Sequence, residues 1–502
     1  MKYVDNFLNG ITMYKLVLYG LFILVGLSIL LGFAGLVPFS GLHLIYTFFT
    51  LTIVCFTTNE LLGKLFKVQL NTESSSITAL ILFLVVFPVS DIASLKIVAL
   101  AGFIAMASKY FLAINKKHVF NPVAISLVLL GLFGSGIGAW WIGSDVLLIP
   151  TAILGFLVLR KIRKFQMFFV FLVTAIISIF VTRYSSGVDV LSLFKEIFVS
   201  WPIIFFGTIM FTEPLTTPPS KKLQFGYAFI VGSIFGMQLH WGSLYTTPEL
   251  ALVIGNIFSY IVSPRARLVL TLIRKDKLTS DVYDFVFKSS EKLNFKPGQY
   301  LEWTLGHKAD SRGNRRYFTI ASSPTEENII LGTKFYPNPS TFKQKMLNMV
   351  EGEKMIASQL SGEFVMPDDK NKKLVFIAGG IGVTPFRSMA KYMLDKGESR
   401  DINFFYSCKT MGDMAYKNIF DEAKRVGWKN IYVANQHDGD LDTNCRTGFV
   451  TTEMLIKEIP DYKERMFYIS GTHGMVTMFE DNLKKLGIPR NQIKVDFFPG
   501  FV

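Results

Sequence analysis

The sequence predicts a multidomain membrane protein, in which an all-α polytopic bundle of about ten transmembrane helices precedes a β-barrel domain and an α/β domain with a parallel sheet. Half of the 502 residues are hydrophobic and the mean hydropathy is +0.38, which is too apolar for an ordinary soluble chain. Residues 1–264 hold only 25 of the 90 Lys, Arg, Asp and Glu side chains. The first half is therefore membrane-like in composition, and the second half is soluble-like.

A transmembrane helix needs about 20 mostly apolar residues, and the first half contains ten candidate segments. They cover residues 15–38, 40–58, 75–90, 94–113, 121–138, 143–159, 166–182, 196–212, 224–241 and 247–264. The segment 75–90 is the shortest of them and the weakest candidate.

Positive charge tests this count, because Lys and Arg concentrate in cytoplasmic loops. They gather in every second connection, as at Lys64, Lys116, Arg160 and Lys221, and are sparse in the others. The pattern predicts a multi-pass protein of the cytoplasmic membrane, surrounded by lipid, with both termini and the second half in the cytoplasm. Nine helices with one re-entrant segment would put the second half outside, against the charge pattern.

Charge and cysteine content exclude some other classes. The net charge of +14 divides evenly between the two halves, so the sequence shows no concentrated basic patch and predicts no nucleic-acid partner. The three cysteines, Cys55, Cys408 and Cys445, form no CxxC pair. We therefore expect no iron–sulfur cluster, no structural zinc and no disulfide framework, which suits a reducing compartment.

Two polar segments interrupt the apolar half near its predicted inner face. One is HVFNPVAISLVLL, where Asn121-Pro122 opens a helix, since Pro is well tolerated at a helix start. The other is FTEPLTTPPSKK, which carries Glu213. A carboxylate at membrane depth is costly and points to function, but a carboxylate at the lipid–water boundary that only caps a turn explains the residue equally well.

These segments, together with NTESSSITALILFLVVFP, resemble the RnfD/NqrB family of membrane proteins, whose members belong to Rnf complexes and to the sodium-pumping NADH:quinone reductase. The resemblance covers most of residues 15–264. It implies a flavin in the membrane, which that family attaches through a Thr on the outer side. The matching place here reads GAWWIGSDVLLIP and has no Thr, so any FMN in the membrane half is expected to be noncovalent.

The second half divides near residue 370. Residues 265–370 contain short β-rich runs between turn signals, such as RLVLTLIRKD and NIILGTKFY, which is typical of a small barrel. Residues 371–502 alternate strands and helices, beginning KLVFIAGG and TPFRSMAKYMLDKG, which is typical of a parallel sheet. The predicted domains are therefore 1–264, 265–370 and 371–502.

The barrel region carries the motif RYFTIASSP, which begins with Arg316 and Tyr317. The planar fork of Arg316 suits phosphate oxygens. The ring of Phe318 can lie against a planar ring system, and the hydroxyl of Thr319 can hydrogen-bond a ring nitrogen. Taken singly, each residue is better explained as part of an ordinary barrel strand.

A second phosphate contact is expected in PNPSTFKQKM, where Ser340 and Thr341 begin a helix. Free N–H groups and the helix dipole favour an anion at such a start, although an ordinary N-cap explains Ser340 alone.

The α/β region carries AGGIGVTPF after a buried strand and before a helix. Gly379, Gly380 and Gly382 allow the backbone to approach a dinucleotide phosphate closely, and Thr384-Pro385 opens the helix. A GGxG run alone is weak evidence, but a strand before it and a helix after it strengthen the prediction of a nucleotide site.

Together the two motifs resemble the ferredoxin–NADP reductase superfamily, over residues 265–502. The resemblance implies an FAD-binding β-barrel at 265–370 and an NAD(P)-binding α/β domain at 371–502. It adds Tyr300 of the PGQY strand and Ser470-Gly471 of YISGTHGM, where the family often has Cys-Gly-Pro. Phe498 and Phe501 are candidates for the aromatic residue that the family often places near the flavin, although an ordinary strand-end Phe is commoner. The choice between NADH and NADPH is open, since Lys409 can meet a 2′-phosphate or be merely solvated.

The sequence therefore predicts an enzyme that transfers electrons from cytoplasmic NADH or NADPH through FAD to a membrane acceptor, which can be a flavin, a quinone or a partner redox subunit. Hydride transfer to a flavin needs no acid–base residue, so no catalytic side chain and no metal site are predicted. Two alternatives have different requirements. A redox-coupled cation transporter would move ions across the membrane. A haem-containing ferric-reductase-like protein would need paired histidines, whereas His43, His118 and His240 are isolated in the sequence.

Overall fold

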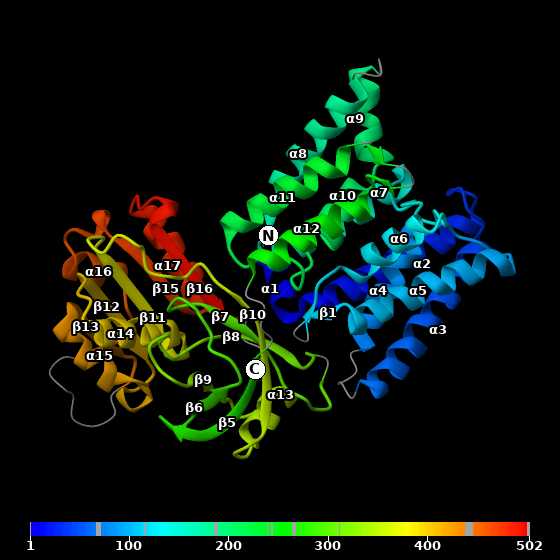
Figure 1. The fold of residues 1–502 in the computed structure, drawn as a ribbon. Helices are drawn as coiled ribbons and strands as arrows, with labels where there is room; N and C mark the ends of the chain where they lie inside the picture. The colour runs from blue at the N-terminus through cyan, green and yellow to red at the C-terminus, as the bar shows by residue number, and fades with distance from the viewer. Residues whose placement is uncertain are drawn as a thin grey trace. The chain divides into compact units, whose positions relative to one another are not determined.

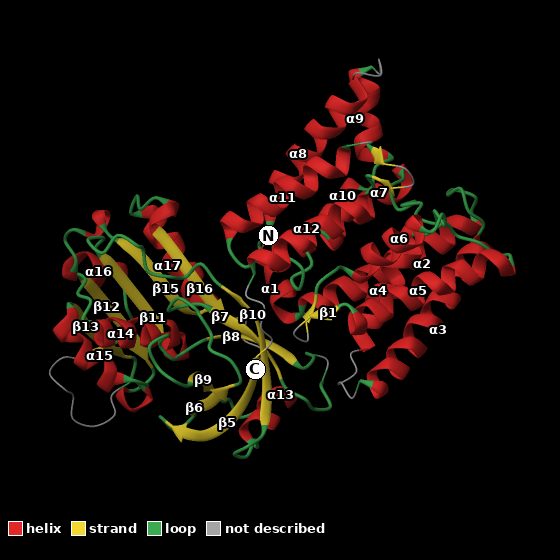
Figure 2. Cartoon of the chain, in the orientation of Figure 1, coloured by secondary structure: helices red, strands yellow, loops and turns green. Residues whose placement is uncertain are grey.

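The computed structural model describes residues 2–66, 72–114, 117–184, 189–237, 239–241, 244–263, 268–310, 312–436 and 445–498. The chain forms two compact units, Met1–Ala266 and Arg267–Val502 (Figure 1). Figure 2 shows that the first unit consists mainly of helices, whereas the second contains the two large sheets.

The first unit contains thirteen helical segments among its described residues. They are α1 (Lys2–Gly10), α2 (Met13–Phe33), α3 (Gly41–Leu65), α4 (Thr72–Val85), α5 (Ile92–Phe111), α6 (Pro122–Leu132), α7 (Asp145–Ile162), α8 (Phe165–Tyr184), α9 (Val190–Val199), α10 (Ile203–Phe205), the π-helix η1 (Phe206–Met210), α11 (Lys221–Gly236) and α12 (Pro248–Val262). Short antiparallel hairpins precede α6 and α12: β1 (Ala113–Ile114) with β2 (Lys117–His118), and β3 (His240–Trp241) with β4 (Leu244–Tyr245).

Each of the ten predicted apolar segments overlaps a helix, but the helices differ in length. Four of them, α2, α3, α5 and α8, are long and apolar enough to cross a membrane. A fifth span results if α9 and the α10–η1 pair, which bend by 54°, count as one. The helices α4, α6 and α12 are apolar but shorter. The first unit is therefore helical and partly membrane-like, and ten spans stay a prediction.

The starts of α6 and α12 follow from their sequence. Pro122 and Pro248 lie at the first helical position, where a missing N–H is not needed. Asn121 caps α6 by accepting from the backbone N–H groups of Val123 and Ala124, each at 3.1 Å. Thr247 caps α12 by accepting from the N–H of Leu250 at 3.3 Å.

The first part of the second unit is a six-stranded antiparallel sheet in the order β8-β7-β10-β5-β6-β9. Its strands and one helix are β5 (Leu268–Lys277), β6 (Val282–Ser289), β7 (Tyr300–Thr304), β8 (Arg315–Thr319), β9 (Ile329–Lys334), α13 (Thr341–Leu347) and β10 (Lys354–Ser361). The two edge strands approach each other beyond β8, where the N–H of Ala321 donates to the carbonyl of Ile330 at 2.9 Å. This arrangement fits the predicted barrel.

The second part is a six-stranded parallel sheet in the order β14-β13-β12-β11-β15-β16. Its elements are β11 (Leu374–Gly379), the 3-10 helix η2 (Gly380–Val383), α14 (Thr384–Lys396), β12 (Ile402–Cys408), η3 (Met411–Asp413), α15 (Lys417–Ala423), η4 (Lys424–Val426), β13 (Trp428–Ala434), β14 (Cys445–Thr447), α16 (Thr452–Glu458), η5 (Tyr462–Glu464), β15 (Met466–Thr472), α17 (His473–Lys485), η6 (Arg490–Gln492) and β16 (Ile493–Phe498).

The parallel sheet is buried on both faces, as βαβ connections require. Successive residues of β11 pack into different clusters, Phe376 into one with Phe404 and Met389, and Val375 into another with Phe405. The strand order reverses between β11 and β15. In open α/β sheets, ligands bind in the crevice at such a reversal, and here the predicted glycine turn follows β11.

Candidate functional site

Arg316 lies on β8 with its guanidinium largely buried. Its Nη1 donates to the backbone carbonyls of Arg312, Gly313 and Arg315, at 2.8, 3.1 and 2.7 Å. The guanidinium carbon lies 5.2 Å from the ring centre of Phe342 on α13. The local turn therefore fixes the guanidinium beside the start of α13, where the sequence predicts a phosphate contact.

The side chains of β8 alternate between two faces. The ring of Phe318 lies 6.1 Å from that of Phe342, on the side of Arg316. Tyr317 is 46% exposed, and its hydroxyl donates to Glu302 Oε2 at 2.9 Å. Its ring meets that of Tyr300 edge-on at 5.7 Å. Of the predicted residues, Arg316 and Phe318 thus belong to one group, and Tyr300 and Tyr317 form another.

The last residue of β8 contacts the parallel sheet. The hydroxyl of Thr319 donates to Asp496 Oδ2 on β16, at 3.3 Å. Sequence reasoning missed Asp496, because 177 residues separate the two and no local pattern marks it. The contact puts a carboxylate beside the hydroxyl that is predicted to meet the flavin ring.

The start of α13 is already engaged by side chains of its own unit. Ser340 caps the helix by accepting from the N–H of Lys343 at 3.4 Å. The N–H of Thr341 donates to Asp310 Oδ2 at 3.1 Å, and the Thr341 hydroxyl accepts from the N–H of Asp310 at 3.0 Å. Asp310 therefore accepts from one of the N–H groups that were predicted to bind phosphate. The phosphate contact of Ser340 and Thr341 stays a prediction.

Three cations, Arg316, Arg312 and Lys343, surround this helix start, and sequence reasoning missed the last two. Burial, with the positive charge of Arg312 nearby, lowers the pKa of Arg316 to about 10. Burial, with the charges of Arg316 and Arg312, lowers the pKa of Lys343 to about 8. Burial opposes ionisation of Asp310, but hydrogen bonds from Arg312 and Thr341 hold its pKa well below the usual range. One carboxylate among three cations leaves an electropositive site that fits a pyrophosphate.

The glycine turn after β11 lies against the end of β15. A Cβ at Gly382 would lie 2.5 Å from the carbonyl oxygen of Ser470 and 2.6 Å from the backbone of Gly471. A Cβ at Gly379 would lie 2.2 Å from Met475 Sδ. Gly380 has φ +53°, which favours glycine. The predicted residues of the two segments are thus brought together, chiefly because Gly382 lets the turn pack on the backbone of Ser470 and Gly471.

Two further features of this turn fit a nicotinamide nucleotide. Ser470 Oγ is buried and has no hydrogen-bond partner among the described residues. Thr384 begins α14 with its hydroxyl donating to the carbonyl of Ile381 at 3.3 Å, and Pro385 follows it in the first turn. An unsatisfied buried hydroxyl is rare, and the amide of a nicotinamide would supply a partner.

The C-terminal candidates are less well placed. Phe498 ends β16 opposite Thr472, and its side chain is outside the described part of the chain. Phe501 lies outside the described residues altogether. Their predicted position beside the flavin stays a prediction.

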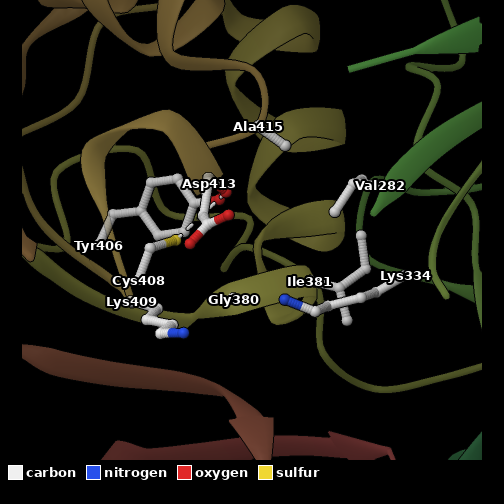
Figure 3. Close-up of a pocket in the computed structure, with 9 residues that line it drawn as sticks. All are labelled: Val282, Lys334, Gly380, Ile381, Tyr406, Cys408, Lys409, Asp413 and Ala415. Atoms are coloured by element: carbon white, nitrogen blue, oxygen red, sulfur yellow. Dashed lines mark hydrogen bonds between the residues drawn. The ribbon is translucent and has the colours of Figure 1, made fainter. Parts of the chain in front are cut away.

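A small pocket adjoins the glycine turn (Figure 3). It is lined by Val282, Lys334, Gly380, Ile381, Tyr406, Cys408, Lys409, Asp413 and Ala415. Lys409, the residue considered for a 2′-phosphate, lines it together with Asp413, whose carboxylate would repel one. Burial raises the pKa of the Cys408 thiol to about 11, so this thiol is protonated at neutral pH. In the described part of the chain, no group of three or more His, Cys, Asp and Glu side chains is placed to hold a metal.

In the first unit the two polar segments meet. Asn121 Nδ2 donates to Glu213 Oε2 at 2.9 Å, and His118 Nε2 lies 3.5 Å from Glu213 Oε1. The backbone N–H of Asn121 donates to Asn256 Oδ1 on α12, at 2.7 Å. Glu213 therefore belongs to a network of three segments rather than capping its own turn alone.

Comparison with known proteins supports the function predicted for the second unit. Residues 376–481 match the family model "Oxidoreductase NAD-binding domain". A flavohemoprotein of Burkholderia sp. (strain TH2) is 26% identical over 239 residues, which are 47% of this chain and 60% of that protein. The glycine betaine monooxygenase reductase subunit of Chromohalobacter salexigens is 26% identical over 227 residues, 44% of this chain and 61% of that protein. The chain thus spans about 60% of the length of these curated relatives.

Solved structures with detectable similarity include the cytochrome P450 reductase GcoB of Amycolatopsis, with 20% identity and a TM-score of 0.42 over 47% of this chain and 71% of that one. Another is the FAD/NAD-binding domain of nitric oxide dioxygenase from Vibrio cholerae, with 16% identity and a TM-score of 0.40 over 46% of this chain and 98% of that one.

The sequence matches support a ferredoxin–NADP reductase-like module for FAD and a nicotinamide nucleotide in the second unit. The module is an NAD(P)H-dependent flavin oxidoreductase, so that prediction is confirmed. The resemblance of the first unit to the RnfD/NqrB family stays a prediction.

Proposed function

We propose that the protein is a membrane-bound, flavin-dependent NAD(P)H oxidoreductase that passes electrons from cytoplasmic NADH or NADPH through FAD to a membrane acceptor. One observation carries the proposal: the flavin motif on β8 and the glycine turn after β11 belong to one compact unit, and Thr319 contacts Asp496 of the parallel sheet at 3.3 Å. A cofactor held by either motif would therefore lie near a cofactor held by the other.

The chain's own residues bind and orient in this proposal. Bound FAD would accept a hydride from the nicotinamide and release its two electrons one at a time. Arg316 and Lys343 would neutralise the pyrophosphate, and Thr319 would hydrogen-bond the flavin ring. Gly382 and Ser470 would seat the nicotinamide. No side chain needs to move a proton in the hydride step.

The exposed surface of the first unit supports a membrane location. Its long helices expose large apolar side chains, as at Ile23 (68%) on α2, Ile53 (58%) on α3 and Phe169 (63%) on α8. Lipid would cover side chains that are exposed in this way. We place this unit in the cytoplasmic membrane as ten spans, with both termini and the reductase module in the cytoplasm.

The acceptor is proposed as a class: a membrane flavin such as noncovalent FMN, a quinone or a partner redox protein. The buried network of Glu213, Asn121 and His118 favours one second candidate, a redox-coupled cation transporter of the Rnf type, because a membrane carboxylate is costly without a role. A haem protein is disfavoured, since His118 is engaged with Glu213.

The test is a cofactor inventory of the full chain purified in detergent. We expect one FAD per chain, no haem, and complete release of flavin by acid. Flavin that stays on the polypeptide would contradict the noncovalent assignment, and a chain without FAD would contradict the proposed function.

A further inference from the structure

A buried polar network joins the antiparallel sheet to α14, the helix that follows the glycine turn. Its centre is Arg387, whose side chain is 7% exposed. Nη2 of Arg387 donates to Glu326 Oε1 at 2.9 Å, and Nη1 donates to Glu326 Oε2 and, at 3.1 Å, to the carbonyl of Ala321. One residue further, the hydroxyl of Ser388 donates to the carbonyl of Ser322 at 2.6 Å.

Two more contacts cross the same boundary. The hydroxyl of Tyr416 donates to Asp284 Oδ1 on β6, and the Tyr416 ring lies 5.8 Å from the guanidinium of Arg387. The hydroxyl of Thr325 donates to Asp395 Oδ2 on α14 at 2.5 Å. Gly332 on β9 makes room for this arrangement, since a Cβ there would lie 2.3 Å from the Tyr416 hydroxyl.

The network contacts the chain in or beside both proposed binding motifs. The carbonyls that hold α14 belong to Ala321 and Ser322, which lie within the flavin motif and follow Thr319 by two and three residues. The glycine motif AGGIGVTPF ends in the first turn of α14, and Arg387 and Ser388 follow it directly. A shift of this network would therefore move one binding motif relative to the other.

Stability alone is a weak reason to bury such a pair. Removing two charges from water costs several kcal/mol per ion, and apolar residues of similar volume often serve as well. A bidentate Arg–carboxylate pair does, however, fix direction as well as distance. Hydride transfer depends steeply on geometry, because a displacement of about 1 Å can cost about 100-fold in rate.

We propose that Arg387 is a positioning residue for hydride transfer, which acts through Glu326 and the carbonyl of Ala321 to hold the nicotinamide site at a fixed distance from the flavin. The inference rests on the proposed function of the module. It predicts that loss of the network slows flavin reduction without weakening the binding of either nucleotide.

The experiment is stopped-flow reduction of the bound flavin in the full-length, detergent-purified protein, with NADH and NADPH varied to separate the limiting rate from the dissociation constant. For Arg387→Met we expect a limiting rate about 10- to 100-fold lower, an unchanged dissociation constant and unchanged FAD content. Glu326→Gln keeps the size of the side chain and should fold; it should lower the limiting rate by a smaller factor.

Arg465→Met is the matched control, because Arg465 is equally buried and makes a bidentate pair with Asp401, at 3.1 and 2.9 Å, wholly within the parallel-sheet part. It should lower the thermal midpoint but leave the limiting rate unchanged. An unchanged limiting rate in both Arg387→Met and Glu326→Gln would overturn the proposal, as would an equal loss in Arg465→Met. If the wild-type flavin is not reduced by either nucleotide, the proposed function itself fails, which is a distinguishable result.

Discussion

The two proposed nucleotide sites of the second unit differ in the kind of residue that forms them. The flavin side gathers charged side chains, Arg316, Arg312 and Lys343, around one carboxylate at the start of α13. On the nicotinamide side, Gly382 has no side chain and can therefore pack on the backbone of β15. Binding at the first site should therefore depend on charge, pH and salt. Activity at the second site should be sensitive to the addition of a single methyl group. The two predicted phosphate contacts therefore depend on different properties, electrostatic attraction at the first site and close approach of the backbone at the second.

Gly382→Ala should have the largest effect. Its Cβ would lie 2.5 Å from a carbonyl oxygen and 2.6 Å from the backbone atoms of Gly471, and backbone cannot rotate away. The turn must shift, so we expect reduction of the flavin by NADH or NADPH to fall by about 100-fold or more, with FAD content retained.

Gly474→Ala is the matched control on the neighbouring helix α17, since a Cβ there meets nothing within 4 Å. It should be reduced at the wild-type rate. Equal rates for the two alanine variants would refute the close-packing account of the nicotinamide site.

Arg316→Ala should have the next largest effect and should act on the other cofactor. A hydrogen bond to a charged group contributes about 1.5–3 kcal/mol, so we expect FAD to bind roughly 10- to 100-fold more weakly. The measurement is FAD content after gel filtration, followed by titration of the depleted protein with FAD. Arg274→Ala, an exposed arginine on β5 paired with Asp276, serves as the control. Full FAD content in Arg316→Ala would remove this residue from the site.

Changes at Lys343 should have the smallest effect on FAD binding, but they test most directly the role of charge at this site. Its pKa of about 8 in the protein without FAD should rise when a pyrophosphate binds. A pKa raised by binding means that the gain in affinity is complete below about pH 8 and is lost as pH rises through the pKa of the complex. We therefore expect the FAD dissociation constant to increase several-fold between about pH 7 and pH 9.

Lys343→Met should abolish that increase and bind FAD more weakly at pH 7. Lys345→Met, on the same helix, should keep the wild-type pH profile, because Lys345 pairs with Glu353 at 2.8 Å. A flat wild-type profile would show that Lys343 does not face the cofactor.

Local sequence patterns predicted helix positions in the first unit better than helix ends. In the segment 196–212, which was expected to be one span, α9 ends at Val199, before Pro202, and the α10–η1 pair continues at an angle of 54°. The segment 121–138 ends early at Leu132, since Gly134 adopts φ +76° and Gly138 pairs with Val86. Hydropathy alone does not predict such backbone pairing, so it does not predict where this helix ends.

In the second unit, sequence motifs identified candidate residues whose structural context comes from adjacent residues in the chain. The glycine turn and the RYFT strand were visible because strand, turn and helix follow in order. Asp310, Asp496 and Arg387 were missed, because their partners come from elements that only the fold brings together. Lys343 was the exception: it follows Ser340 by three residues, and this spacing could have marked it as part of the helix start.

The most direct test of the account is the absorbance spectrum of the full-length protein in detergent, recorded before and after anaerobic addition of NADH or NADPH. We expect the spectrum of oxidised, noncovalent FAD, bleached by at least one of the two nucleotides. A protein whose FAD is bleached by neither nucleotide, or a protein without flavin, would contradict the claim that the second unit transfers electrons from a nicotinamide nucleotide to a membrane acceptor.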